Sequence, residues 1–380
     1  MRRAAKIAFG ASAGALVYAQ AGYPLLLAAL ARRRGRTAPE PVPPPAAAEP
    51  MVSLIVAAHR EAEVIAEKVR NARALEWPAD RLEVIVACDG SPDDTPERAR
   101  AAGADLVLEL ARGGKVRAQD AAVAAARGEL LAFSDANARW EPGALRALAA
   151  RFADPAVGYA CGQVRFVSDG GTNQEGLYWR YEMAVRALES LLASVTAGNG
   201  AIYAVRRAAY VEVDPVMGHD LKLPFTLVKA GWRAVYEPAA RASEKMVPTI
   251  EGEFARKRRM MSHAWPIVLR GGMLDPRGYP PLYALMIASH RVLRYAGPFL
   301  HVVALLASLI LARRGGRLHR AALAAQLALL AAAAAGGRVR ARPLLVARYY
   351  VLTTASIAAG LADHLRHGTA AGWTPPEGTR

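Results

Sequence analysis

Long uncharged stretches mark both ends of the chain. Residues 8–31 carry no charged side chain and are long enough to cross a bilayer as a helix. Lysine and arginine residues flank this stretch on both sides. A cleavable secretory signal is the alternative interpretation, but the stretch is longer than a typical signal core. We therefore predict a retained N-terminal transmembrane helix within residues 1–36.

Three further apolar blocks lie near the C-terminal end. They cover residues 295–312, 321–335 and 344–362, and two short basic loops separate them. The second block is short and rich in alanine. Together the blocks predict two or three transmembrane helices within residues 295–363, followed by a tail over 364–380. Both loops are basic, although they would face opposite sides of a membrane if all three blocks spanned it. The positive-inside rule therefore leaves the orientation open.

The chain between these apolar ends alternates between strand and helix patterns. A proline-rich stretch over residues 37–50 predicts an extended linker. Residues 51–251 then alternate β-branched runs with stretches of helical period, which predicts an α/β domain with a parallel sheet and helices on both faces. The strand-like runs are 51–59, 82–90, 105–110 and 129–137. After them, residues 252–294 predict an amphipathic region at the membrane interface.

The charge balance narrows the class of partner. The 380 residues have a formal net charge of +16, mostly from arginine. Such an excess suits nucleic acid, an anionic membrane or phosphate-bearing ligands. The sequence has no zinc-finger, basic-zipper or RNA-binding aromatic motif, and much of the arginine flanks the apolar blocks. We therefore expect membrane lipids, and no nucleic acid, as partners. The two cysteines, Cys88 and Cys161, are too few for a disulfide framework, which suits a reducing compartment.

Polar side chains follow the predicted strands. Asp135 and Asn137 end one apolar run, and Asp89 ends another. Such residues are often simple turn formers, but the carboxyl ends of parallel strands meet at one edge of a sheet, where ligands bind. A glycine-bearing loop adds Arg112 and Lys115. Carboxylates for a divalent cation beside cations for phosphate predict a site for a nucleoside diphosphate. No Walker loop is present, and no G-x-G-x-x-G follows the first strand.

Six segments in order resemble family 2 glycosyltransferases, the GT-A fold group that includes cellulose, chitin and hyaluronan synthases. The resemblance covers about residues 51–265. The segments are VSLIVAAHREAEVI, VIVACDGSPDDT, GGKVRAQDAAVAAARGELLAFSDAN, TAGNGAIYAVRR, GHDLKLPFTLVKAGWRAVYEP and EFARKRRMM. The resemblance implies a Rossmann-like GT-A domain over residues 51–251 with flanking transmembrane helices.

The resemblance also implies a role for individual residues. Asp220 would be the general base. Asp135 and Asn137 would hold Mg²⁺ or Mn²⁺ against the diphosphate of a nucleotide sugar. The nucleotide-sugar contacts would be Glu61, Asp89, Arg112, Lys115, Asp135, Arg256 and Arg259. The acceptor side would comprise Gly198, Asn199, Gly200 and His219.

Several positions depart from the family pattern. Asn137 stands where the last Asp of the metal motif is usual, and an amide brings no charge to the metal. His219 stands where Glu is usual before the base. Met260 replaces a tryptophan that lines the acceptor site of processive synthases, which weakens the case for a long polymer. Cys88 replaces the first Asp of its motif.

The sequence thus predicts an inverting, metal-dependent hexosyltransferase. It would be a multi-pass protein of the cell (plasma or inner) membrane with a cytoplasmic catalytic domain. The donor would be a nucleotide sugar, first of all a UDP-sugar, and the acceptor a cell-surface glycan or a glycolipid, as in cell-wall or exopolysaccharide synthesis. Two alternatives stay open. One is the transfer of a single sugar to a polyprenyl phosphate, and the other is a catalytically silent, nucleotide-sugar-binding partner of an export complex.

Overall fold

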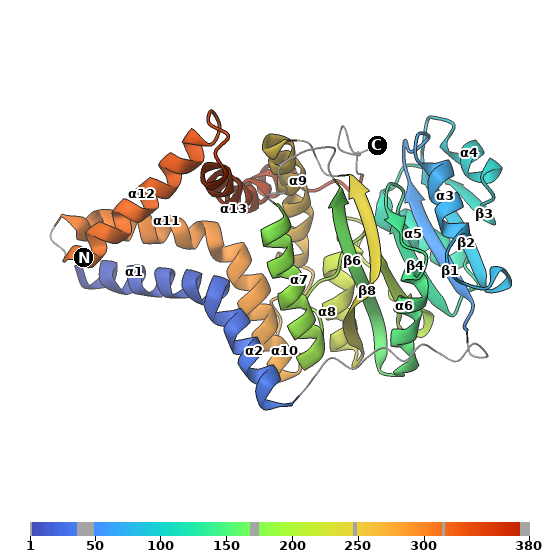
Figure 1. Cartoon of the computed structure of the whole chain (residues 1–380), viewed down its shortest axis with the longest axis horizontal. Helices are drawn as coiled ribbons and strands as arrows, with labels where there is room; N and C mark the ends of the chain where they lie inside the picture. The colour runs from blue at the N-terminus through green and yellow to red at the C-terminus, as the bar shows by residue number, and fades with distance from the viewer. Residues whose placement is uncertain (1, 36–48, 168–174, 246–248, 314–315, 373–380) are drawn as a thin grey trace.

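The protein is described by a computed structural model that covers residues 2–35, 49–167, 175–245, 249–313 and 316–372. Side chains of residues 175–178 are not described. Most of the predicted proline-rich linker, residues 37–50, lies outside the described residues. A sheet flanked by helices makes up one part of the molecule, and a group of long helices makes up the other (Figure 1).

The central sheet has eight strands in the order β3-β2-β1-β4-β7-β6-β8-β5. The strands are β1 (Val52–Ala58), β2 (Leu82–Asp89), β3 (Leu106–Leu110), β4 (Leu130–Asp135), β5 (Arg139–Trp140), β6 (Val157–Val167), β7 (Tyr203–Arg206) and β8 (Arg233–Lys245). Every residue of β1 and β2 is buried. Their near-continuous apolar sequences reflect a sheet covered on both faces.

The sheet of the described residues is mixed, because β7 and β5 run against the direction of the other strands. The strands β3, β2, β1 and β4 pair in parallel, as predicted. Beyond them, β7 is antiparallel to both β4 and β6, β6 and β8 pair in parallel, and β5 is antiparallel to β8. The predicted parallel pairing therefore holds from β3 to β4 and again between β6 and β8, and it is wrong for the pairs made by β7 and β5. The alternation of strands and helices that supports parallel pairing continues only as far as β4, and the chain later enters β7 from the opposite end of the sheet.

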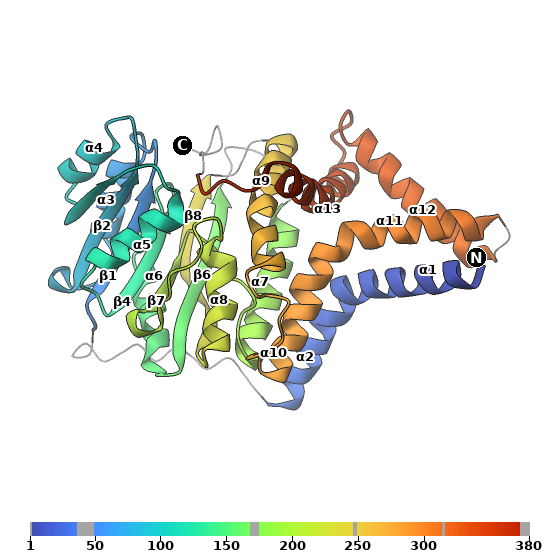
Figure 2. The same cartoon turned by 180° about the vertical axis from the view of Figure 1, so that it is seen from behind.

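Helices cover both faces of the sheet, as predicted (Figures 1 and 2). Alternate residues of β1 point to opposite faces, so Ile55 belongs to one hydrophobic cluster and Leu54 to the other. The face of Leu54 packs against α3 (Ile65–Arg73), α4 (Thr95–Ala101) and α6 (Ala144–Ala150). The face of Ile55 packs against α5 (Lys115–Ala125), α7 (Glu175–Leu192) and α8 (His219–Lys229).

Two of the long helices bend at π-helical turns. The first runs through α1 (Arg2–Val17), a π turn at Tyr18–Gly22 and α2 (Tyr23–Arg33). The second runs through α10 (Pro281–Met286), a π turn at Ile287–Val292 and α11 (Leu293–Ala312). In Figures 1 and 2, α1 and α11 lie side by side and point away from the sheet, whereas α2 and α10 lie beside α7. The bends thus connect the outer helices to the sheet domain.

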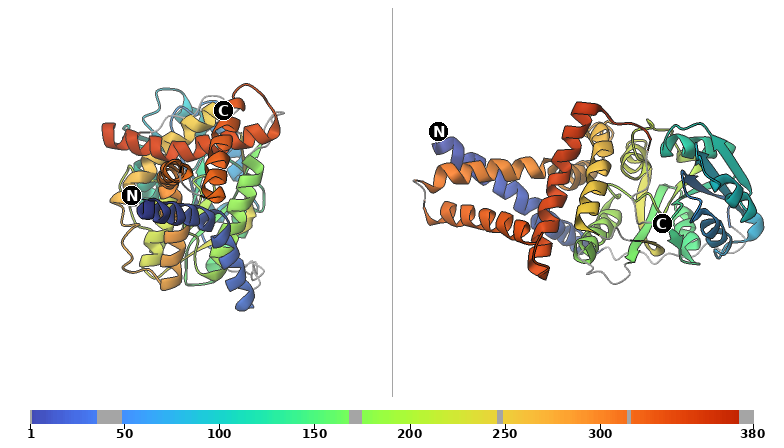
Figure 3. Two further views of the ribbon diagram at one scale, coloured as in Figure 1. Left: turned by 90° about the vertical axis from the view of Figure 1, so that its left-hand side faces the viewer. Right: turned by 90° about the horizontal axis from the view of Figure 1, so that it is seen from above.

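Four helices of the described residues are long and apolar enough to cross a membrane. They are Arg2–Arg33, Pro281–Ala312, α12 (Arg317–Ala335) and α13 (Arg342–His367). The second begins at Pro281, well before the predicted start at residue 295. Figure 3 shows that α1, α11 and α12 extend together from the domain, whereas α13 runs across them. The number of helices that cross a membrane stays a prediction.

The helix α13 packs against α9 (Ile250–Leu269), which carries the predicted Arg-x-x-Arg motif. Trp265 Nε1 donates to the Ile357 carbonyl at 2.9 Å, and Arg258 Nε donates to the Asp363 carboxylate at 2.6 Å. A Cβ atom on Gly360 would lie 2.6 Å from the Cβ of Met261. Such close contact means that α13 and α9 pack as a unit.

Candidate active site

The sheet brings two of the predicted site residues to one edge. Asp89 ends β2 and Asp135 ends β4, and both strands pair in parallel with β1. The register places Asp135 opposite Ala57, and Cys88 opposite Ala58. The two carboxylates therefore leave the sheet on either side of the end of β1. Glu61 follows β1 and is buried there, where its amide donates to Thr95 Oγ1 at 3.0 Å.

The buried Asp89 carboxylate binds the glycine-bearing loop that carries Arg112 and leads to Lys115. It accepts the Gly113 amide at 2.6 Å and the Gly114 amide at 3.0 Å, and Arg112 Nη1 lies 2.6 Å from its other oxygen. Ion pairing and backbone donors of this kind are the strong hydrogen bonds of proteins. We predicted that Asp89 contacts the nucleoside directly. The structure shows that its carboxylate fixes the loop that leads to Lys115.

The C-terminal segment reaches the same loop. A Cβ atom on Gly114 would collide with the carbonyl oxygen of Ala371, and one on Gly372 would lie 3.6 Å from Arg112 Nη2. Thr369 Oγ1 donates to the Ser262 carbonyl at 2.9 Å, which holds the segment against α9. This contact could not be predicted from the sequence, because no local pattern pairs residues more than 250 positions apart.

Lys115 and two carboxylates form the centre of the candidate site. The Lys115 ammonium, at the start of α5, forms an ion pair with Asp135. Burial by itself would lower the pKa of Lys115, but the nearby Asp135 and Asp220 carboxylates raise it. Burial raises the pKa of Asp220, and Lys115 partly opposes this. A carboxyl group with a raised pKa suits a general base that works near neutral pH.

The turn after Asp135 is held by a lysine that sequence reasoning missed. Lys68 is buried and donates from Nζ to the Ala138 carbonyl at 2.8 Å, while its ammonium lies over the Trp140 ring at 5.3 Å. Burial lowers the pKa of Lys68 to about 7. A signal exists in the sequence, since Lys68 shares the inward face of its helix with Ile65 and Ala72. A lysine on an apolar helix face indicates a specific buried partner.

The glycine-rich segment at residues 196–200 links the central residues. The Gly198 amide donates to the Asp220 carbonyl at 2.7 Å. A Cβ atom on Gly200 would lie 3.3 Å from Lys115 Nζ, so this backbone passes beside the Lys115–Asp135 pair. Asn199 Nδ2 donates to the Gly162 carbonyl at 2.6 Å, and its Oδ1 accepts the Ile202 amide. The Asn199 side chain therefore shapes the segment.

The structure places His219 among aromatic rings. Its Nδ1 lies 2.9 Å from the Tyr203 hydroxyl, and its ring meets Phe133, Tyr203 and Tyr210 edge-on. Burial lowers the pKa of His219 to about 3, so the ring is neutral near pH 7. These contacts favour a packing role for His219 over the predicted contact with an acceptor.

The two predicted diphosphate arginines lie on α9. The Arg256 guanidinium contacts both oxygens of the Glu253 carboxylate at 2.7 Å. Arg259 is partly buried, and burial lowers its pKa. Both Arg259 and Asp220 act on the pKa of His263, one helical turn further along α9. The helix α9 therefore faces the site of the presumed base, and its arginines stay predicted ligands.

The donor groups near Asp135 fit a divalent cation that shares its ligands with a substrate. In the described parts of the chain, no three His, Cys, Asp or Glu side chains gather into a closed metal cage. Mg²⁺ is commonly held by one or two carboxylates together with substrate phosphates. The Asp135 side chain is about 31% exposed, and the amide oxygen of Asn137, two residues further along the chain, stays the predicted second donor. This set suits a metal that arrives with a diphosphate.

The sequence of the chain is similar to those of known glycosyltransferases. Residues 53–220 match the family model described as Glycosyl transferase family 2. An N-acetylglucosaminyltransferase of Rhizobium leguminosarum bv. viciae is 27% identical over 231 residues, which is 55% of this chain and 54% of the relative. A beta-monoglucosyldiacylglycerol synthase of Synechocystis sp. is 32% identical over 156 residues, 38% of this chain and 32% of the relative. The chain thus spans about half the length, or less, of these curated relatives.

One solved structure resembles the chain over nearly its full length. It is the mannosyltransferase PcManGT from Pyrobaculum calidifontis in complex with GDP-Man and Mn²⁺. The two chains superpose with a TM-score of 0.72 at 25% identity, covering 94% of this chain and 99% of the other. The predicted GT-A fold is thereby confirmed, and the likeness extends into the long helices.

Proposed function

We propose that this chain, which belongs to glycosyltransferase family 2, is a membrane-bound inverting transferase that moves a sugar from a nucleotide-diphosphate donor to a glycan or glycolipid acceptor. The predicted family membership is confirmed. The narrower likeness to cellulose, chitin and hyaluronan synthases stays a prediction. The observation that carries the proposal is the ion pair of Lys115 with Asp135 at the edge of the sheet, beside the glycine-rich segment that is bonded to the backbone of Asp220.

In this proposal, Asp220 is the general base. Its carboxylate accepts the proton of an acceptor hydroxyl as that oxygen attacks the anomeric carbon of the donor. The new carbon–oxygen bond forms as the bond from that carbon to the diphosphate breaks, and the nucleoside diphosphate leaves with the bonding electrons. Attack from the side opposite the leaving group inverts the anomeric configuration. The raised pKa of Asp220 supports proton transfer near neutral pH.

The chain's own cations stabilise the leaving group. Lys115, which pairs with Asp135, would contact the diphosphate, and Arg259 would approach it from α9. Asp135 and Asn137 would hold Mg²⁺ or Mn²⁺, and the metal would neutralise charge that develops on the departing diphosphate. Mn²⁺ and GDP-Man are bound in the complex of the similar mannosyltransferase, which supports a metal here and adds GDP-sugars to the UDP-sugars as candidate donors.

A membrane location for the acceptor is supported by two observations. Four described helices are long and apolar enough to span a bilayer. The similar synthase from Synechocystis is named for a glycosyl diacylglycerol. We therefore place the catalytic domain at the cytoplasmic face of the cell membrane, with a glycolipid or growing glycan as acceptor.

The decisive experiment measures nucleoside diphosphate release by the full chain in lipid nanodiscs. UDP-, GDP- and dTDP-sugars are offered with Mn²⁺ or Mg²⁺, with and without diacylglycerol, polyprenyl phosphate or oligosaccharide acceptors. We expect metal-dependent release that Asp220→Asn abolishes. Transfer to polyprenyl phosphate alone would replace the proposed acceptor. Nucleotide binding without release from any donor would identify a silent partner and refute the proposal.

A further inference from the structure

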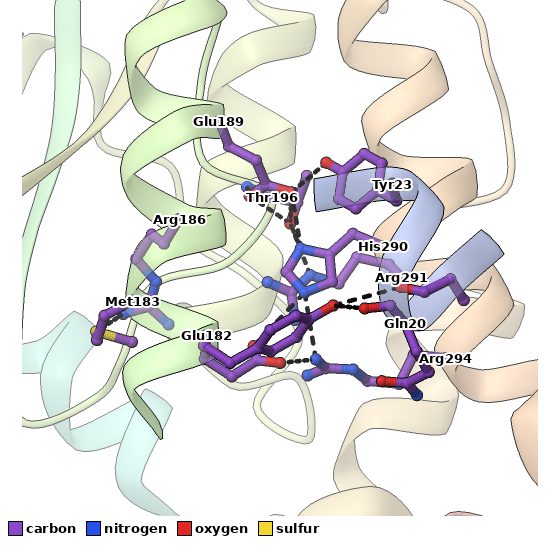
Figure 4. Close-up of polar contacts among 12 residues, drawn as sticks. Gln20, Tyr23, Glu182, Met183, Arg186, Glu189, Thr196, His290, Arg291 and Arg294 are labelled. Atoms are coloured by element: carbon purple, nitrogen blue, oxygen red, sulfur yellow. Dashed lines mark hydrogen bonds and ion pairs between the residues drawn. The ribbon is translucent and has the colours of Figure 1, made fainter. Parts of the chain in front are cut away.

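A buried polar cluster joins α7 to the two bent helices, and we call it the bend cluster (Figure 4). Its members are Tyr23, Glu182, Glu189, Thr196, His290, Arg291 and Arg294. Tyr23 directly follows the π turn of the first bent helix, and His290 and Arg291 lie in the π turn of the second. Glu189 and Thr196 have no exposed surface. The cluster therefore lies where the sheet domain meets both bends.

Glu189 is the centre of the bend cluster. Its carboxylate accepts the Tyr23 hydroxyl at 2.6 Å and the Thr196 amide at 3.1 Å, and His290 Nδ1 lies 2.7 Å from Oε1. Burial would raise the pKa of Glu189, but His290 and Arg291 outweigh this and lower it. One carboxylate thus ties both bent helices to the residue that begins the glycine-rich segment.

A second set of contacts fixes Thr196 from the same side. Its hydroxyl accepts from Arg291 Nε at 2.8 Å and reaches both Glu189 oxygens. Tyr283 of α10 donates from its hydroxyl to the carbonyl of the preceding residue, Val195, at 2.9 Å. The start of the glycine-rich segment is therefore held by side chains from α7, α10 and the second π turn.

The segment passes this constraint to the presumed base. Two residues beyond Thr196, the Gly198 carbonyl accepts from Arg186 Nη2 at 2.9 Å. The Gly198 amide donates to the Asp220 carbonyl at 2.7 Å. Buried hydrogen bonds, together with the backbone from Thr196 to Gly198, thus connect Tyr23 and His290 to the backbone of Asp220.

The free-energy cost of burying these polar and charged groups indicates that the bend cluster does more than attach the bent helices to the sheet domain. Buried ion pairs are weak evidence for stability, because desolvation offsets their attraction, and apolar side chains can fill such an interface equally well. A buried, fully bonded polar network instead fixes one geometry. Both helices also bend at π turns within this network, and π turns occur often at functional sites.

We propose that Glu189 and Thr196 are positioning residues, which fix the 196–200 segment and the backbone of Asp220 relative to the membrane helices. An acceptor that approaches along those helices then reaches Asp220 with its hydroxyl aligned with the anomeric carbon of the donor. This inference rests on the proposed transferase function. It predicts that the bend cluster controls use of the acceptor, whereas the Asp89 loop controls binding of the nucleotide.

The kinetic test uses changes that preserve shape. Thr196→Val replaces the hydroxyl by a methyl group, whereas Thr196→Ser keeps the hydroxyl. Glu189→Gln replaces the carboxylate by an amide of similar volume. Glu83→Gln is the matched control, because Glu83 is also a buried carboxylate and binds Ser53 and Arg127 elsewhere in the domain. We expect Thr196→Val and Glu189→Gln to lower kcat/KM for the acceptor about tenfold, as loss of one buried hydrogen bond implies. Nucleotide affinity should change less than about twofold, and Thr196→Ser and Glu83→Gln should keep wild-type acceptor kinetics.

A second readout does not depend on activity. Amide hydrogen exchange is followed over residues 194–202 and 218–222 in the full chain in nanodiscs. We expect faster exchange at Gly198 in Thr196→Val and Glu189→Gln, and wild-type exchange there in Glu83→Gln. If the wild type transfers no sugar, the proposed function fails, and the exchange data alone decide the coupling. Unchanged exchange, or an equal loss of nucleotide and acceptor use, would overturn the inference.

Discussion

Asp89 on β2 holds the backbone of Gly113 through a hydrogen bond of 2.6 Å from amide to carboxylate. The same carboxylate pairs with Arg112, so its two oxygens bind the loop that leads into α5 and Lys115. We therefore expect Asp89 to act on a nucleotide through this loop. This differs from direct recognition of the base, and the two roles can be separated by experiment.

Replacing Asp89 by Asn tests which role dominates. The amide keeps the shape but weakens the pairing with Arg112 and the hydrogen bonds from Gly113 and Gly114. If Asp89 fixes the loop, the Kd values for UDP and GDP should rise together, by about tenfold. If Asp89 reads the base, the ratio of the two Kd values should change instead. Isothermal titration with both nucleotides measures this directly.

Gly114→Ala should weaken nucleotide binding, whereas Gly113→Ala should not. Gly114 has φ +98°, a backbone conformation that residues with a Cβ rarely adopt, and its new methyl would collide with the Ala371 carbonyl. The methyl of Gly113→Ala would meet only the Arg117 Cδ, at the flexible part of a long side chain. We expect a rise in Kd of about fivefold or more for Gly114→Ala only.

Deleting the residues after Gly368 separates the two causes of weaker nucleotide binding in Gly114→Ala, the collision with Ala371 and the strained backbone. The deletion removes the collision with Ala371 but leaves the strained φ angle of Gly114→Ala. Partial recovery of nucleotide affinity in the double variant would indicate that the C-terminal segment contacts the working site. No recovery would assign the whole effect to the backbone of Gly114.

Asp220→Asn should abolish transfer and raise stability. The folded state raises the pKa of Asp220 above its unfolded value, so the stability that it contributes below the unfolded pKa is lost as the pH rises through the folded pKa. The Tm of the variant should match that of the wild type in acid, where the Asp220 carboxyl is protonated in both the folded and the unfolded state, and should exceed it at pH 8. Differential scanning fluorimetry measures this, and a lower Tm for the variant at pH 8 would contradict the burial argument.

The rate of transfer should depend on the protonation state of Asp220. In the wild type, kcat/KM should fall as the pH drops through the raised pKa of Asp220, at a pH above the usual range of an aspartate. An acid limb at the ordinary aspartate value would mean that Asp220 is not the base.

Asn137→Asp should tighten metal binding. The new carboxylate adds a charged oxygen beside Asp135, and ligand charge tunes the affinity of such sites. We expect the Kd for Mn²⁺ in the presence of UDP to fall by about tenfold, and Asp135→Asn to raise it by a similar factor. Electron paramagnetic resonance of free Mn²⁺ reports both. An unchanged affinity in both variants would remove these residues from the metal site.

The contact between α9 and α13 predicts opposite effects for two glycines in long helices. A Cβ on Gly360 would lie 2.6 Å from Met261 Cβ and 2.8 Å from the Ser262 amide, so Gly360→Ala should destabilise by about 1–3 kcal/mol. Gly297 in α11 has no atom within 4 Å of the same position, and Gly297→Ala should stabilise by up to about 1 kcal/mol. Thermal unfolding in detergent compares them, and equal shifts would argue against the close packing of α13 on α9.

Local patterns predicted much of this protein. Runs such as those of β1 and β2 are almost continuously apolar, so they specify buried strands. The alternation with α3, α4 and α5 then specifies parallel pairing and places Asp89 and Asp135 at one edge of the sheet. The ordered motifs indicated the family, since each couples a residue type to a position at the end of an element.

The tertiary structure decided what depends on distant contacts. The antiparallel strands β6 and β7 could not be predicted, because their pairing partners are chosen by the packing of α7 and α8 and not by a local period. The partners of Asp89, the burial of His219 among aromatic rings, and the reach of Ala371 to Gly114 likewise join segments far apart in the chain. In the same way, Glu189 meets Tyr23 and His290 only because two helices bend at π turns beside α7. The period of the apolar residues determines which side of a helix or strand is buried. Only the packing of these elements into a core determines which polar groups come into contact.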